Sequence, residues 1–350
     1  MRITFNPVRT AAAWALLGAL AAAVPAAAAV SATRAELVMG TIARVTLDEP
    51  RDDAFVAAFG ALRRVDAAMS LYRPESDLVR VNIHAAHHAE PVADDLFECL
   101  VRARALSEIT DGAFDVTILP LLRGWGAYRD LEYLPAGRID AVGWGGLVLD
   151  AATRSVSFAR DGMAIDLGGI AKGYGLDRAR AALLATGARR GLLDLGGNLL
   201  LVGDGPEGRW RIAVRDPADP EGSLGTLGLD RDLAVATSGN YERDFSAEGW
   251  RAPSHVFDPR TGRPAAAGLA VTVWAPAATT ADALSTALLV IGLRDAAAVL
   301  ARVPGAGALF IDDRGAARRI TLAGAPPGSF EPYSAAAIPV VSTVRKENEE

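Results

Sequence analysis

Short apolar segments separated by Gly, Pro and Asp turns fill the second half of the chain, and this pattern constrains the fold more than any other feature. We expect strands at Leu192–Leu195, Leu199–Val202, Trp210–Val214, Leu233–Thr237, His255–Asp258 and Leu269–Trp274. Helical segments are mixed with these strands without a regular strand–helix–strand alternation. The sequence therefore predicts an α+β fold with mixed, mainly antiparallel sheets and packed helices.

The first half of the chain begins with an alternating segment from Leu37 to Leu47, which predicts a half-buried strand. Gly40 lies inside it, as a bulge or a place where a ligand approaches closely. Four helices are expected, after Asp52 (with Phe55, Phe59, Leu62, Val65 and Met69 on one face), over Asp94–Ile109, from Ile170 to Leu184, and from Thr279 or Thr280 to Ile291. Residues 70–82 and 131–146 are expected to be loops.

The composition is that of a globular protein, with 51% hydrophobic and 22% charged residues. Its 36 basic and 42 acidic residues give a net charge of −6, which argues against nucleic acid as the main partner. The single cysteine, Cys99, lies on a predicted helix face and is expected to be inert core.

The N-terminus has the pattern of a secretory signal peptide over residues 1–30, with Arg2 and Arg9 before an apolar run and a small-residue zone. An uncleaved membrane anchor is the alternative. We expect an exported protein, periplasmic if the host is bacterial, and soluble or loosely membrane-associated. After this signal segment we expect one domain over residues 35–330 and a C-terminal tail over residues 331–350.

The segment AIDLGGIAKGYGLDRA is the most informative for chemistry. A short strand ends at Asp166, paired glycines form a turn, and a helix begins with Lys172 in its first turn. Helix N-termini bind phosphate, and a lysine there is unfavourable unless an anion compensates it. An ordinary turn with a solvated lysine remains the alternative.

The segment TTADALSTALLVIG places Asp282 and Thr286 four residues apart on one helix face, with Ser285 beside them. Carboxylate and hydroxyl oxygens suit Mg²⁺. The alternative is helix capping, because Thr279 and Asp282 have the spacing of a capping box.

Three other features are ambiguous on their own. His255 precedes a turn and could point into a cleft, although a lone strand histidine is commonly structural. His84, His87 and His88 have metal-like spacing but lie in a polar segment, which favours solvated surface. Tyr72 and Phe114 are candidates for stacking on a flavin or adenine ring, or for the core.

Eight segments, taken in order, resemble the ApbE family of FAD:protein FMN transferases. They are VMGT, MSLYRPESDLVRVN, DGAFDVTILPLLRGWG, AIDLGGIAKGYGLDRA, LLDLGGNLLLVG, ATSGNYER, SHVFDPRTGRP and ADALSTALLVIG. The resemblance implies a T-fold-like architecture and a catalytic domain over residues 35–330. Asn198 is a departure, because the family often has an acidic residue at that position.

The resemblance also implies roles for individual residues. The flavin nucleotide would be contacted by Met39, Tyr72, Ala113, Phe114, Asp115, Asp166, Lys172 and Val256. Magnesium would be held by a backbone oxygen near Gly169 together with Asp282, Ser285 and Thr286. His255 would accept the proton of the attacking hydroxyl, and Asp282 would serve catalysis through the metal.

The implied reaction is Mg²⁺-dependent cleavage of FAD, with transfer of FMN to a Thr or Ser hydroxyl of an acceptor protein and release of AMP. The acceptor would also bring the protein near a membrane if it is itself membrane-bound. Two alternatives remain open, an FAD pyrophosphatase that yields FMN and AMP, and a non-catalytic flavin-binding protein. The choice between Mg²⁺ and Mn²⁺ also stays open.

Overall fold

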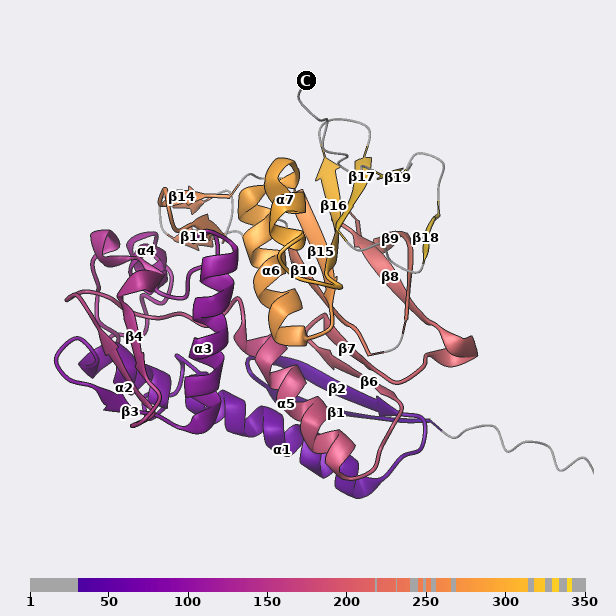
Figure 1. Cartoon of the computed structure of the whole chain (residues 1–350), viewed down its shortest axis with the longest axis horizontal. Helices are drawn as coiled ribbons and strands as arrows, with labels where there is room; N and C mark the ends of the chain where they lie inside the picture. Colours follow the sequence, from indigo (N-terminus) through magenta and orange to yellow (C-terminus); the bar gives the residue numbers. More distant parts are fainter. Residues whose placement is uncertain are drawn as a thin grey trace, which may run out of the picture.

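The centre of the protein is a nine-stranded sheet with the order β1-β2-β6-β7-β10-β15-β16-β17-β19 (Figure 1). The structure is a computed structural model that describes residues 31–217, 219–230, 232–239, 245–247, 250–252, 256–265, 269–313, 318–324, 329–333 and 339–341. Neighbouring strands are antiparallel except β17 and β19, which are parallel. The strands are β1 (Ala32–Val38), β2 (Thr41–Leu47), β6 (Gly191–Leu195), β7 (Asn198–Val202), β10 (Ala234–Gly239), β15 (Leu269–Ala275), β16 (Gly307–Asp313), β17 (Arg318–Gly324) and β19 (Pro339–Val341). The predicted α+β, mainly antiparallel fold is confirmed.

Four helices cover one face of this sheet and form the main core with it. They are α1 (Asp52–Met69), α5 (Ala171–Ala185), α6 (Ala278–Ile291) and α7 (Leu293–Leu300). On the opposite face, β8 (Trp210–Asp216), β9 (Asp219–Leu229) and β18 (Ser329–Pro332) form a small sheet over a second core that includes Trp210 and Trp274. Two hairpins are separate, β11 (Phe245–Ala247) with β12 (Trp250–Ala252), and β13 (Phe257–Asp258) with β14 (Arg263–Pro264).

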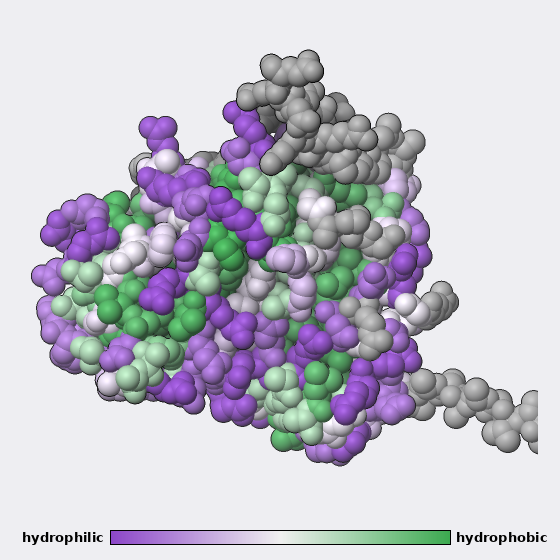
Figure 2. All heavy atoms as spheres, viewed as in Figure 1, coloured by the Kyte–Doolittle hydropathy of each residue, from purple (hydrophilic) through white to green (hydrophobic). Residues whose placement is uncertain are grey.

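A smaller lobe lies beside the sheet, at the left of Figure 1. It contains α2 (Asp77–His84), α3 (Asp94–Ile109), α4 (Leu119–Gly124) and a sheet of β3 (Glu90–Pro91), β5 (Ser155–Phe158) and β4 (Leu147–Asp150), around its own core. Polar and apolar residues are interspersed over the face of both parts that is seen in Figure 2. Within the described ranges, no helix is both long enough and apolar enough to cross a membrane.

The amphipathic helices follow the sequence pattern closely. The helix α3 has the predicted bounds, Asp94–Ile109, and the five apolar residues predicted for one face of α1 are all buried. Cys99 is fully buried in the smaller lobe, and burial raises the pKa of its thiol far above the ordinary value. The prediction of an inert core cysteine is consistent with this position.

The prediction of one strand from Leu37 to Leu47 was wrong. Met39 and Gly40 both have positive φ, 54° and 71°, and form a two-residue hairpin turn between β1 and β2. In such a hairpin an odd-numbered residue of β1 pairs with an even-numbered residue of β2, and paired residues point to the same face of the sheet. Leu37 therefore lies opposite Ile42 and is 81% exposed, while Ala43 is buried.

The predicted loop over residues 70–82 was also wrong, because α2 begins at Asp77. Ser76 caps it, accepting a hydrogen bond from the Val79 amide at 3.1 Å. Part of the predicted 331–350 tail belongs to strands, since β18 ends at Pro332 and β19 pairs with β17. Of the predicted strand His255–Asp258, β13 comprises Phe257–Asp258, and His255 lies outside the described residues.

Candidate active site

A cavity of about 720 Å³ opens where the β1–β2 turn, the loop before α4, the N-terminal turn of α5 and the middle of α6 come together. Most residues selected from the sequence line it, although they are far apart in the chain. Those residues are Met39, Tyr72, Ala113, Phe114, Asp115, Asp166, Gly169, Lys172, Val256, Asp282 and Thr286. Ser285 is not among the lining residues, and His255 lies outside the described part of the chain although Val256 and Phe257 directly after it line the cavity.

Asp282 joins the two helices that form one wall of the cavity. Its Oδ2 accepts a hydrogen bond from the backbone amide of Gly173 at 2.9 Å. The helices are close here because residue 173 is glycine, since a Cβ on it would lie 2.2 Å from the Ala278 carbonyl oxygen. Asp282 is only 4% exposed, and no ion pair to its carboxylate is found among the described residues. A buried carboxylate with so few partners favours binding of a cation.

Helix capping does not account for Asp282. The N-terminal turn of α6 is capped from another helix, because the Asp177 carboxylate accepts hydrogen bonds from the amides of Ala278 at 2.8 Å and Thr279 at 2.9 Å. The Thr279 hydroxyl also donates to Asp177. The capping alternative for Thr279 and Asp282 is therefore wrong, and the Asp282 carboxylate is left facing the cavity.

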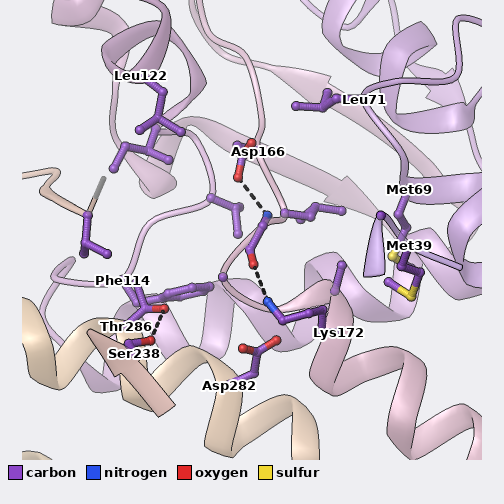
Figure 3. Close-up of a pocket in the computed structure, with 18 of the residues that line it drawn as sticks. Met39, Met69, Leu71, Phe114, Leu122, Asp166, Lys172, Ser238, Asp282 and Thr286 are labelled. Atoms are coloured by element: carbon purple, nitrogen blue, oxygen red, sulfur yellow. Dashed lines mark hydrogen bonds between the residues drawn. The ribbon is translucent and has the colours of Figure 1, made fainter. Parts of the chain in front are cut away.

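The hydroxyl groups of α6 are placed differently from each other. Thr286 Oγ1 lies beside Gly169, where an added Cβ would come within 3.2 Å of it. Ser285 is buried, its Oγ donates to the Asp282 carbonyl at 2.8 Å, and it lies 2.7 Å from Ser238 Oγ. Thr286 and Asp282 (Figure 3) thus border one space together with Gly169, whereas Ser285 does not line the cavity.

Asp166 lies in the loop before α5, opposite Asp282 across the cavity (Figure 3). Its two oxygens accept hydrogen bonds from the Gly168 amide and the Tyr128 hydroxyl, both at 2.7 Å. Burial raises the pKa of Asp166 above its ordinary value, and these two bonds and Lys172 work against that shift. Lys172 Nζ is 3.4 Å from the Gly168 carbonyl oxygen, so the lysine reaches back over the glycine turn toward the cavity.

Asp115 fixes the shape of a loop, although it lines the cavity. Its Oδ1 accepts hydrogen bonds from the amide and hydroxyl of Thr117, and its Oδ2 accepts one from the Trp144 amide at 2.8 Å. Burial raises the pKa of this carboxyl group as well. The structure shows no strand at Phe114 and Asp115, and the segment is a loop held by these bonds.

Aromatic rings line two parts of the cavity, one at Tyr72 and Tyr128 and the other at Phe114 beside Thr286 of α6. Tyr72 and Tyr128 meet edge to face, with ring centroids 5.9 Å apart, and Phe114 lies near Gly169. Such surfaces suit a planar heteroaromatic ligand.

Polar residues of the cavity that the sequence did not assign to the site include Asp66, Tyr128, Asn198 and Ser238. Asn198 is buried, and its Nδ2 has no hydrogen-bond partner in the described structure. The sequence did contain a signal for Asn198, because it directly follows the paired glycines Gly196 and Gly197, just as Lys172 comes shortly after another glycine pair. Tyr128 follows a glycine-rich stretch in which no periodicity marks it.

The charges around the cavity are unbalanced. Four carboxylates line it, from Asp66, Asp115, Asp166 and Asp282, and Lys172 is the only cationic side chain among its described lining residues. Asp66 is paired with Arg73 at 2.8 Å. An anionic ligand would therefore need an additional cation here.

The sequence model of the ApbE family matches residues 39–310. A Treponema pallidum protein named FAD:protein FMN transferase is 34% identical over 304 residues, covering 80% of this chain and 84% of that protein. A Vibrio cholerae protein of the same name is 35% identical, covering 66% and 71%. The solved ApbE protein of Thermotoga maritima has a TM-score of 0.71 at 33% identity, covering 82% of this chain and 96% of that one. The Pseudomonas stutzeri flavinyl transferase ApbE has the same TM-score at 30% identity and covers 84% and 95%. This chain belongs to the ApbE family.

Proposed function

We propose that the protein is an FAD:protein FMN transferase that uses a divalent metal ion to cleave FAD and attach FMN to a hydroxyl group of another protein. The observation that carries this proposal is the cavity itself, which combines aromatic walls, the N-terminal turn of a helix and a buried, nearly unpaired carboxylate at Asp282. The relatives that share this family are named for the same reaction.

The charge balance supports a metal ion as part of the site. A diphosphate would enter a cavity whose lining carries four carboxylates and one lysine. Asp282, Thr286 and the Gly169 backbone offer hard oxygen donors that fit Mg²⁺, and the Ser285 hydroxyl donates to the backbone carbonyl of Asp282. A bound Mg²⁺ would neutralise negative charge on the diphosphate as the bond breaks, and Mn²⁺ would supply the same chemistry.

The protein groups would divide the remaining work. Lys172, in the first turn of α5, suits the phosphates, because the positive end of the helix dipole lies beside it and also attracts anions. Tyr72, Phe114 and Met39 would contact the rings, with Ala113 and Val256 completing the walls. Asp166, held by Tyr128 and Gly168, is placed to accept a hydrogen bond from a ribose or ribityl hydroxyl.

The transfer step needs a base for the acceptor hydroxyl. We assign this role to His255, because Val256 and Phe257 directly after it line the cavity. The acceptor oxygen would attack the phosphorus of the FMN half, and the bond to the bridging oxygen would break. The hydroxyl proton would pass to His255, and AMP would leave with the bridging oxygen.

The cellular setting is part of the same proposal. We propose that residues 1–30 act as a secretory signal and that the protein works outside the cytoplasm, where a membrane-bound acceptor would bring it near a membrane. Intact mass of the secreted protein would show whether residues 1–30 have been removed.

The proposal is tested by incubating the protein with FAD, Mg²⁺ and an acceptor protein that the Vibrio cholerae relative modifies, and then measuring the acceptor's intact mass. The acceptor should gain one FMN less water, and AMP should form in equal amount. The matched variant is Asp282→Asn, which keeps an oxygen for the Gly173 amide but loses the charge, and it should lower the rate at least about 100-fold. His255→Ala should slow transfer without weakening FAD binding.

Two results would reject the proposal. Free FMN and AMP with an unmodified acceptor would show a pyrophosphatase. FAD binding without any product, unaffected by Asp282→Asn, would show a flavin-binding protein without catalysis.

A further inference from the structure

Three side chains with metal-binding atoms come together outside the cavity, at the surface of the smaller lobe. They are His84 at the end of α2, His88 after it and Glu90 in β3 (Figure 1, lower left). We propose that this His84–His88–Glu90 cluster binds a first-row transition-metal dication, with Zn²⁺ as the best-suited ion. The sequence favoured solvated surface for these histidines, because they lie in a polar segment.

The separations in the cluster are close to those a metal ion requires. One ligand atom from each residue lies within 4.8 Å of the other two. Ligands at about 2.0–2.1 Å from a tetrahedral zinc ion lie about 3.3 Å from each other. His88 Nδ1 and Glu90 Oε1 are already 3.2 Å apart, so this pair needs little change in separation to share an ion.

The backbone holds the two imidazoles on the same side. His84 and His88 are four residues apart, and the His88 amide donates to the His84 carbonyl at 3.2 Å, which continues the helical spacing past the end of α2. Their rings are nearly parallel, with an interplanar angle of 15° and centroids 5.6 Å apart. His87, between them in sequence, is exposed and is not part of the cluster.

Glu90 is the anchor of the proposed site. It is only 7% exposed, whereas His88 is at the surface, and its strand is fixed by pairing with Val156 in β5. Its other oxygen, Oε2, lies 3.9 Å from Arg80 Nε. Arg80 is itself bound to the Asp77 carboxylate at 2.7 Å, which offsets its positive charge near an incoming cation.

Two imidazoles and one carboxylate select borderline transition metals rather than Mg²⁺, which prefers oxygen ligands. The cluster is therefore chemically distinct from the all-oxygen site proposed at Asp282. Three protein ligands leave a fourth position for water. The ion would connect the C-terminal end of α2 to β3. At the other end of α2, the Ser76 hydroxyl donates a hydrogen bond to the carbonyl oxygen of Ser70, a residue of the cavity wall, at 2.8 Å.

The test is a Zn²⁺ titration of the tag-free full chain by calorimetry, with Mg²⁺ in large excess so that oxygen-rich sites are occupied. Co²⁺ absorption spectra provide a second measurement, because ligand-field bands report on nitrogen coordination. Four variants are compared, His84→Ala, His88→Ala, Glu90→Gln and the matched control His87→Ala. Circular dichroism verifies that each variant is folded.

We expect one Zn²⁺ per chain in the wild type and in His87→Ala, and at least about tenfold weaker binding in each of the other three variants. Asp282→Asn should leave this Zn²⁺ affinity unchanged, which separates the cluster from the proposed magnesium site. Zn²⁺ binding that is undiminished in His84→Ala and His88→Ala, or equally reduced in His87→Ala, would overturn the proposal. So would the absence of any stoichiometric Zn²⁺ binding in the wild type.

Discussion

The backbone amide of Gly173 donates a hydrogen bond to the carboxylate of Asp282 at 2.9 Å, and this contact joins α5 to α6 through two residues that are 109 positions apart in the chain. It orients the carboxylate toward the cavity, and it depends on the absence of a side chain at position 173. The candidate metal ligand is thus held by packing as well as by a hydrogen bond.

Replacing Gly173 with alanine should destabilise the fold. The new Cβ would lie 2.2 Å from the Ala278 carbonyl oxygen, so α5 and α6 would have to separate, at a cost of about 2–3 kcal/mol in the free energy of unfolding. Gly60→Ala in α1 is the matched control, because its nearest neighbour atom would be 3.8 Å away. Urea unfolding should show Gly60→Ala to be neutral or stabilising. Equal stability of the two variants would contradict the close-packing argument.

Asn198→Ala should weaken FAD binding but leave the free protein almost as stable as before. Asn198 Nδ2 is buried without a partner in the described structure, so truncation removes no hydrogen bond of this atom until a ligand is present. We expect a loss of about 1.4 kcal/mol, or roughly tenfold in Kd, measured by fluorescence quenching of FAD.

Asn82→Ala is the contrast to this variant. The Asn82 side chain is bonded twice to the backbone of Ile165, at 2.6 Å and 2.9 Å, so its loss should lower the melting temperature. If Asn198→Ala instead unfolds as readily as Asn82→Ala and still binds FAD normally, Asn198 is structural.

Asp166→Asn should stabilise the protein at neutral pH while lowering activity. Burial raises the pKa of Asp166 above its ordinary value of 3.8, so the folded state holds the proton more tightly than the unfolded state. The free energy of unfolding therefore falls as the pH rises from the pKa of Asp166 in the unfolded state to its pKa in the folded state. The loss is complete above the folded-state pKa. The asparagine variant escapes this penalty, so its advantage should be largest at pH 7 and vanish below about pH 3.8.

Asp140→Asn provides the control of opposite sign. Its bond to Arg138 lowers the pKa of Asp140, so any stability it contributes is present at neutral pH and lost in acid. Urea unfolding curves at pH 7 and pH 4 separate the two cases. A gain for Asp166→Asn that is independent of pH would refute the burial argument.

Cys99 should resist alkylation in the folded protein. Its side chain is fully buried, and burial raises the pKa of the thiol, so little reactive thiolate exists at pH 8. Iodoacetamide should modify it rapidly in urea and only at the unfolding rate in buffer, as followed by intact mass. Rapid modification of the native protein would show that the smaller lobe opens locally.

The parts of the fold that could be predicted are those where one periodicity persists over many residues. The helix α3 has the predicted bounds because its apolar face repeats along four turns. The hairpin at Met39 and Gly40 was missed because alternation on both sides of a tight turn resembles one strand, and methionine is an unusual residue at a position with positive φ.

The candidate site was partly predictable for a different reason. The glycine turn before Lys172 and the spacing of Asp282 and Thr286 are local patterns, and the structure brings them to one cavity. Tyr128 and Ser238 reach the cavity through tertiary contacts with Asp166 and Ser285, and no local pattern marks such contacts. The third member of the His84–His88–Glu90 cluster was hidden likewise, because β3 is only two residues long.

The carboxylate of Asp177 on α5 caps the first turn of α6, and this arrangement makes assembly of this wall of the cavity cooperative. An α6 that is not docked lacks partners for its first amides and should fray at the end that carries Asp282. During synthesis, α5 emerges about a hundred residues before the helix it stabilises, so it must stay in place until the later segment arrives. A chain shortened before residue 278 would therefore lose both the helix that carries Asp282 and the partner that covers α5.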